Sequence, residues 1–112
     1  MIIVTQSIPL TVIQASHSHF FDTMVKAVVD IERGMVALDA ELHADLEDLL
    51  LEAGSLQEYL WGVNIFFDNP QKIEFTSLIN IRPAQNNRGM EVQDPKVKKI
   101  IEEIIFKLIT PS

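Results

Sequence analysis

The sequence predicts an α+β domain: an antiparallel sheet of about four strands from two hairpins, in the order α-ββ-α-ββ-α, with helices packed mainly on one face. The 112 residues, 47% hydrophobic and 22% charged, suit one globular domain over 1–112 with a core of its own. Two pairs of segments alternate apolar and polar residues, and three others have helical spacing. Because short turns join each pair, neighbouring strands are expected to be antiparallel.

Composition excludes several classes of function. The chain has no cysteine, which rules out disulfides, thiol nucleophiles and zinc–thiolate sites. Its formal net charge of −7 argues against nucleic-acid binding, which usually needs a basic face. The apolar runs are shorter than the roughly 20 residues of a membrane span, and the first residues lack the basic segment of a signal peptide. We expect a cytoplasmic protein with no membrane partner and no cofactor.

The first half of the chain predicts a helix followed by a hairpin. Residues 10 to about 21 place their apolar side chains on one helical face. Residues 25–31 then alternate in the manner of a half-buried strand. The Arg-Gly pair at 33–34 supplies a tight turn, and residues 35–38 form the returning strand.

The middle of the chain predicts a second helix and a second hairpin. Residues 41–53 carry an apolar stripe at helical spacing, with Asp39 as the expected N-cap and Gly54 as the stop. Residues 61–68 and 73–82 both alternate, and 73–82 has the most regular alternation in the sequence. Each is therefore expected to be a strand.

The remaining segments are a turn, a loop and a final helix. Residues 68–72 have turn chemistry and 83–93 read as a polar loop. Asp94 and Pro95 are a cap followed by a first-turn proline, which predicts a helix that ends before residue 110.

Three stretches of the chain share a pattern with known proteins: residues 25–31 running into 41–45, residues 61–64 (Trp-Gly-Val-Asn), and residues 78–88. Together they resemble a family of small prokaryotic proteins described as a domain of unknown function, over residues 24–109. Its members often carry Gly-Gly where this chain has Asp39 and Ala40, and Asn-Arg-Ser where it has 87–89. The resemblance implies one compact domain and adds no catalytic residue.

Glu41 and His43 are the catalytic candidates. On a helix that begins at Glu41, His43 lies roughly 160° from both Glu41 and Asp45, so the three cannot converge on one ion. On an extended segment, Glu41 and His43 point the same way and would begin a metal site completed by His17 or His19. The alternative is a solvated first turn in which His43 caps or packs. We assign no metal site.

The loop after the predicted strand 73–82 is the stronger candidate for binding. Two guanidinium groups and three amides lie within seven residues, and arginine binds carboxylate or phosphate through a fixed fork. Strand alternation adds two asparagines to the same sheet face. The expected ligand-binding residues are Arg82, Gln85, Asn86, Asn87, Arg88, Asn64 and Asn80.

Two functional hypotheses from different classes follow. The first is a non-enzymatic binding or regulatory module, homodimeric, whose Arg/Asn-rich loop accepts an anionic small molecule or protein partner. The second is a small hydrolase-like or metal-assisted enzyme in which Glu41 and His43 act with Arg82 or Arg88 as electrostatic stabiliser.

Each hypothesis has a purely structural counterpart. Both arginines of the loop would then pair with nearby carboxylates such as Glu91, and the amides would bond the loop's own backbone. For the homodimer, Phe66, Leu78 and Phe106 are expected to form an exposed apolar patch, although single exposed aromatic residues are also normal.

Overall fold

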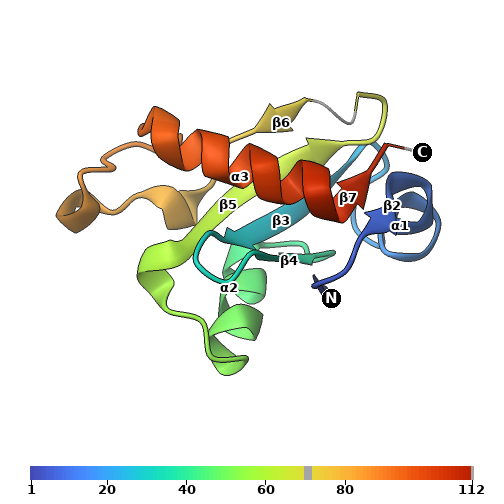
Figure 1. Ribbon diagram of the computed structural model, residues 1–112, viewed down its shortest axis with the longest axis horizontal. Helices are drawn as coiled ribbons and strands as arrows, with labels where there is room; N and C mark the ends of the chain where they lie inside the picture. The colour runs from blue at the N-terminus through green and yellow to red at the C-terminus, as the bar shows by residue number, and fades with distance from the viewer. Residues whose placement is uncertain (70–71, 112) are drawn as a thin grey trace.

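The computed structural model describes residues 1–69 and 72–111 (Figure 1). The strands within these residues are β1 (Ile2–Val4), β2 (Ile8–Pro9), β3 (Met24–Asp30), β4 (Met35–Leu38), β5 (Leu60–Phe66), β6 (Ile73–Glu74) and β7 (Ile109–Thr110). The helices are α1 (Leu10–Ser16), α2 (His43–Glu52) and α3 (Pro95–Leu108), with 3₁₀ turns η1 (Gln57–Tyr59), η2 (Leu78–Asn80) and η3 (Pro83–Gln85).

Five strands form one antiparallel sheet in the order β1-β4-β3-β5-β6. The α+β class and the antiparallel pairing are therefore confirmed, while the expected count of about four strands is too low. Within this sheet the strand missing from the prediction is β1, whose three residues are too few to display alternation. The expected order α-ββ-α-ββ-α also differs from the structure, because the short strands β1 and β2 precede α1 and β7 follows α3. A separate parallel pair, β2 with β7, joins the start of α1 to the end of α3.

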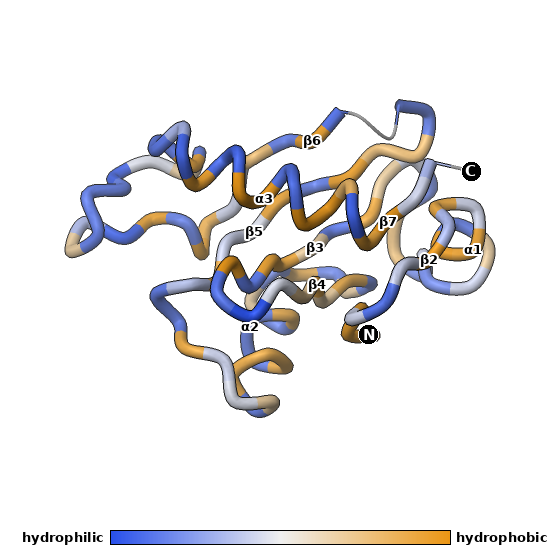
Figure 2. Tube along the Cα trace, viewed as in Figure 1, coloured by the Kyte–Doolittle hydropathy of each residue, from blue (hydrophilic) through white to orange (hydrophobic). Residues whose placement is uncertain are grey.

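Helices lie on both faces of the sheet: α1 and α3 pack in the cluster on one face and α2 in the cluster on the other, so the expectation of helices mainly on one face holds for two of the three helices. Residues Val25, Ala27 and Val29 of β3 pack in the larger core cluster, which α3 closes. Val28 of the same strand packs in a second cluster with Leu46 and other residues of α2. Figure 1 shows α3 crossing in front of β3 and β5, and Figure 2 shows its hydrophobic positions recurring along the helix.

The first two predicted helices have different bounds from those expected. α1 ends at Ser16 rather than near residue 21. α2 begins at His43, and its N-cap is Leu42 instead of Asp39. The Asp39 carboxylate is used elsewhere: Oδ1 accepts the backbone N–H of His19 at 2.9 Å, and Oδ2 lies 2.5 Å from the His19 ring.

The predicted strand over 73–82 is the largest error. Only Ile73–Glu74 pair with β5 as a strand, and the chain then turns into η2. The physical reason is the Asn80 amide, whose Oδ1 accepts Gly62 N–H at 2.8 Å and whose Nδ2 donates to the Gly62 carbonyl at 2.9 Å. These two bonds satisfy the backbone of β5 in place of a continued strand. Part of the expected turn, residues 70 and 71, lies outside the described residues.

The expected hydrophobic patch for a dimer is not one surface. Phe106 lies on α3, whereas alternation along β5 places Phe66 on the face that α2 packs against. Leu78 belongs to η2, beside α2. The homodimer itself stays a prediction. In the described part of the chain, no helix has the length and apolar character needed to cross a membrane.

Candidate functional site

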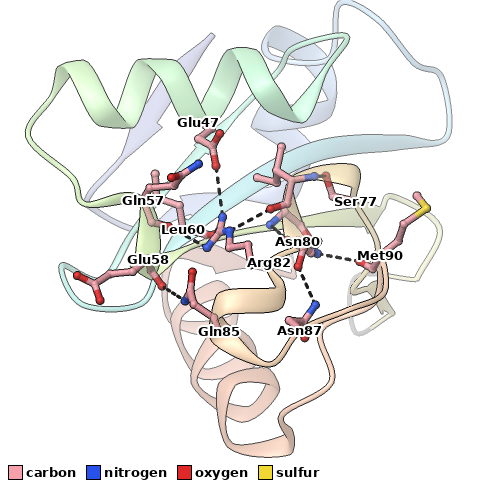
Figure 3. A network of polar contacts seen from close by, with 12 residues as sticks. Glu47, Gln57, Glu58, Leu60, Ser77, Asn80, Arg82, Gln85, Asn87 and Met90 are labelled. Atoms are coloured by element: carbon pink, nitrogen blue, oxygen red, sulfur yellow. Dashed lines mark hydrogen bonds and ion pairs between the residues drawn. The ribbon is translucent and has the colours of Figure 1, made fainter.

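The guanidinium of Arg82 is built into the fold. Its side chain is 9% exposed, and its N–H groups donate to the carbonyls of Ile79, Gln57 and Leu60. It also pairs with Glu47 of α2 at 3.3 Å (Figure 3). Its guanidinium carbon lies 4.8 Å from the centroid of the Trp61 ring. Burial lowers the pKa of Arg82, and the Glu47 charge opposes that shift. With these partners, Arg82 joins η2, β5 and α2.

Two of the expected ligand-binding asparagines also hold the backbone in place. Asn80 is fully buried against β5, and its amide also donates to the Met90 carbonyl. Asn87 donates to three carbonyls, of which that of Asn80 is the closest at 2.7 Å, and it accepts the N–H of Gln93. Figure 3 shows these side chains converging within the loop. The loop's own backbone therefore uses both amides.

The other residues of the loop lie nearer the surface. Gln85 donates to the Glu58 carbonyl, and Asn86 has the left-handed backbone conformation, with φ of 61°. Gln85, Asn86 and Asn87 line a hollow of about 540 Å³ on the α3 side of the sheet, which we call the α3 hollow. Arg88 does not line it.

A second hollow, of about 450 Å³, opens on the other face of the sheet, beside the first residues of α2; we call it the α2 hollow. Its size is that of an ordinary small-molecule site. Its polar lining consists of Lys26, His43, Asn64, Glu74, Thr76 and Ser77. Its apolar lining includes Leu42, Leu78, Ile79 and Met90.

A polar row crosses three strands at the base of the α2 hollow. Lys26 of β3 is paired with Asn64 of β5, and Asn64 is paired with Glu74 of β6. Asn64 Nδ2 donates to Glu74 Oε1 at 2.7 Å. Asn64 is 8% exposed, and its Oδ1 has no hydrogen-bond partner among the described residues. A buried acceptor without a partner is uncommon in folded proteins.

His43 lies at the first turn of α2 and closes one side of the α2 hollow. Its Nε2 is 2.8 Å from the Val63 carbonyl, so Nε2 carries the proton that this bond needs. Burial lowers the pKa of His43, the bond to Val63 raises it, the Lys26 charge lowers it, and the neighbouring Asn64 side chain raises it again. The His43 ring therefore lies beside Asn64, although its Nε2 is committed to the Val63 carbonyl and, within the described residues, no bond to Asn64 Oδ1 has hydrogen-bond geometry. The net effect is a pKa below the ordinary value, so the neutral ring is favoured.

Glycine at position 62 allows the walls of the hollow to approach β5. A Cβ at Gly62 would lie 2.6 Å from Ser77 Cβ and 3.2 Å from His43 Cδ2. Both neighbours line the α2 hollow. A larger residue would therefore push apart the two segments that form it.

Exposed apolar side chains surround the polar base. Leu78 is 72% exposed, Leu42 55% and Met90 42%. The lining thus combines a few polar groups with an apolar rim, as ligand sites usually do.

The two catalytic candidates differ in their surroundings. His43 lines the α2 hollow, whereas Glu41 is exposed and does not line it. None of residues 82–88 lines it either. Across residues 1–69 and 72–111, no cluster of three His, Asp or Glu side chains is placed to hold a metal ion.

Sequence reasoning named Asn64 and His43 as candidate site residues and placed Glu74 on the same polar sheet face as Asn64, but it did not connect Lys26 with them. The available signal was alternation: Lys26, Asn64 and Glu74 are the polar positions of their strands. What the alternation did not reveal is the register that places the three side by side.

Comparison with protein-family models places the chain in a family. A family model described as "Protein of unknown function (DUF5674)" matches residues 2–108. No curated protein and no solved structure matches the chain.

Proposed function

Since the chain belongs to the DUF5674 family of proteins of unknown function, we propose a function from the site alone: a non-enzymatic binding module that holds a small amphipathic ligand in the α2 hollow. The observation that carries the proposal is the buried, unpartnered Oδ1 of Asn64. Leaving such an acceptor unsatisfied costs about 1–3 kcal/mol. A ligand N–H or O–H that donates to Oδ1 removes that cost.

The lining defines the rest of the ligand. The ammonium of Lys26 suits a carbonyl or other acceptor on the ligand, placed next to its donor. The exposed leucines Leu42 and Leu78 suit a hydrocarbon part. A primary amide on an alkyl chain combines a donor, an acceptor and a hydrocarbon in one small molecule.

Binding without catalysis is favoured by how the polar groups are used. The Nε2–H of His43 donates a hydrogen bond to the Val63 carbonyl, and Ser77 Oγ accepts the N–H of Ile79. Within the described residues, no hydrogen bond joins His43 to a hydroxyl or a carboxylate of the α2 hollow. A nucleophile and its base normally lie within hydrogen-bond reach of each other.

The ligand is not placed at the guanidinium of Arg82. Three carbonyls and Glu47 already occupy it, and an anion would have to displace them. An enzyme using Glu41 and His43 with Arg88 would need the three in one cleft, and only His43 lines the α2 hollow.

Hexanamide is the probe that tests the proposal. In ¹⁵N-labelled protein it is expected to shift the amides of residues 42–44, 64 and 76–79, with a dissociation constant on the order of 1 mM for so small a ligand. N,N-dimethylhexanamide lacks the N–H donors and is expected to bind much more weakly. Equal binding of the two compounds would contradict the proposal.

The chain offers a matched pair of variants. Leu42 and Leu56 are both 55% exposed and both are N-cap residues, of α2 and η1 respectively, but only Leu42 lines the α2 hollow. Serine is a good N-cap, so Leu42→Ser and Leu56→Ser should both fold. Leu42→Ser is expected to weaken hexanamide binding several-fold while Leu56→Ser leaves it unchanged. If both variants weakened hexanamide binding equally, the binding site would not be the α2 hollow.

A further inference from the structure

The α3 hollow, on the opposite face of the sheet, has a different chemistry. It is about 540 Å³ in volume, within the range of small-molecule sites. The charged residues that line it, Glu58 and Asp94, are both acidic. Gln85 and Asn87 contribute amides, and Ile31 and Val97 contribute an apolar wall.

The indole of Trp61 lines the α3 hollow and has an unused donor. Trp61 is 5% exposed, and its Nε1 has no hydrogen-bond partner among the described residues. Burying an N–H without a partner is unfavourable, and an acceptor on a bound molecule would satisfy it. The position of Trp61 on β5, three residues before Asn64, places it on the other face of the sheet.

The charged side chains that line the α3 hollow are negative. The pKa of Tyr59, which also lines it, is raised by its hydrogen bond to Glu32 and by the charges of Glu32 and Glu58. One positive charge does lie next to the indole of Trp61: the Arg82 guanidinium is 4.8 Å from the ring centroid. The positive charge of Arg82 is paired with the Glu47 carboxylate, so it does not neutralise Glu58 and Asp94.

We infer that the α3 hollow is a second binding site, for a small organic cation on an apolar stem that also carries a hydrogen-bond acceptor. The acceptor bonds to Trp61 Nε1, the stem packs on Ile31 and Val97, and the cation is attracted by Glu58 and Asp94. This assignment reverses the sign of the charge expected from the arginines of residues 82–88. It is independent of the function proposed for the α2 hollow.

Nα-acetyl-lysine methylamide is the probe, because it combines an ammonium, an alkyl stem and peptide carbonyls. Trp61 is the single tryptophan of the chain, so its fluorescence reports binding directly. We expect a saturable change in emission, weakened by added salt because salt screens the attraction. The neutral analogue Nα-acetyl-norleucine methylamide is expected to bind more weakly. Equal binding of the two compounds overturns the inference.

Variants of the two carboxylates test the same point. Glu58→Gln and Asp94→Asn should each lower the affinity for the lysine probe about two- to fivefold. Asparagine is also a good N-cap, so Asp94→Asn should preserve α3. Glu52→Gln is the control, because Glu52 lies on α2 and does not line the α3 hollow. Loss of affinity in the control equal to that in the two variants overturns the inference.

Two variants and a competition experiment test where the lysine probe binds and whether the site takes a cation or an anion. In Trp61→Phe, NMR shifts at residues 85–87 should show weaker binding of the lysine probe, since the donor is gone. Leu42→Ser, in the α2 hollow, should bind it normally. Inorganic phosphate that binds at residues 85–88 in competition with the lysine probe would overturn the inference and favour an anion site.

Discussion

At the scale of single residues, the loop residues with the most hydrogen-bonding capacity mainly stabilise the fold. From the sequence alone, Arg82 and Arg88 had the same expected role in binding. In the structure, the Arg82 guanidinium donates hydrogen bonds to four acceptors, whereas Arg88 is exposed. Asp39 is another such residue: it has a φ of 75°, a conformation that favours glycine, and it keeps that conformation while bonding His19. Burial raises the pKa of Asp39, but the hydrogen bonds and charge of His19 outweigh it and leave the pKa lowered.

The two arginines are therefore expected to differ sharply in their effect on stability. Arg82→Ala would leave Glu47 and three carbonyls without their partner, and we expect the free energy of unfolding to fall by about 3–5 kcal/mol. Arg88→Ala should change it by no more than about 0.5 kcal/mol. Urea denaturation of both variants measures the difference. Similar losses in the two would show that the buried network is not the source of the stability.

At the scale of elements, the strands and helices with strong local patterns were predictable and the segment 73–82 was not. Local apolar spacing identified β3, β5 and α3 because each packs against its neighbours along its whole length. Residues 73–82 alternate equally well, yet the Asn80 amide bonds Gly62 and replaces the strand. Such a long-range side-chain contact leaves no periodic signal.

The α2 hollow was only half predictable for a similar reason. The sequence singled out Asn64 and His43 as polar groups on a strand and near a helix start. Their meeting depends on the register of β5 with β3 and on the close approach of Ser77 to Gly62. Both are tertiary features, which the local pattern does not encode.

That close approach gives a prediction about how η2 is held on β5. Gly62→Ala is expected to destabilise the protein by about 1–3 kcal/mol, because its Cβ would overlap Ser77. Ser77→Gly removes the overlapping atoms, so the double variant should be more stable than the sum of the two single effects by about 1 kcal/mol or more. A double-mutant cycle by chemical denaturation measures this coupling. Strictly additive effects would mean that Ser77 does not limit position 62.

At the scale of the whole molecule, one sheet separates two hollows of different chemistry. β5 contributes a buried unpartnered acceptor, Asn64 Oδ1, to one face and a buried unpartnered donor, Trp61 Nε1, to the other. Figure 1 shows why this strand can serve both: it runs through the middle of the fold, beside β3. These two atoms are the only buried side-chain polar atoms without a partner in the described chain. Proteins commonly keep such unfavourable groups where they bind ligands.

The most direct test of the account is Asn64→Leu, measured for both stability and hexanamide binding. Leucine has nearly the same shape and removes the unpartnered acceptor, which favours the fold, but it also removes the hydrogen bond from Asn64 Nδ2 to Glu74. Because Glu74 is exposed, water can replace that donor, and the free energy of unfolding should change by no more than about 1 kcal/mol. Hexanamide binding at residues 42–44 and 76–79 should be lost in the same variant. A variant that binds hexanamide with the affinity of the natural chain would contradict the central claim that Asn64 Oδ1 receives the ligand.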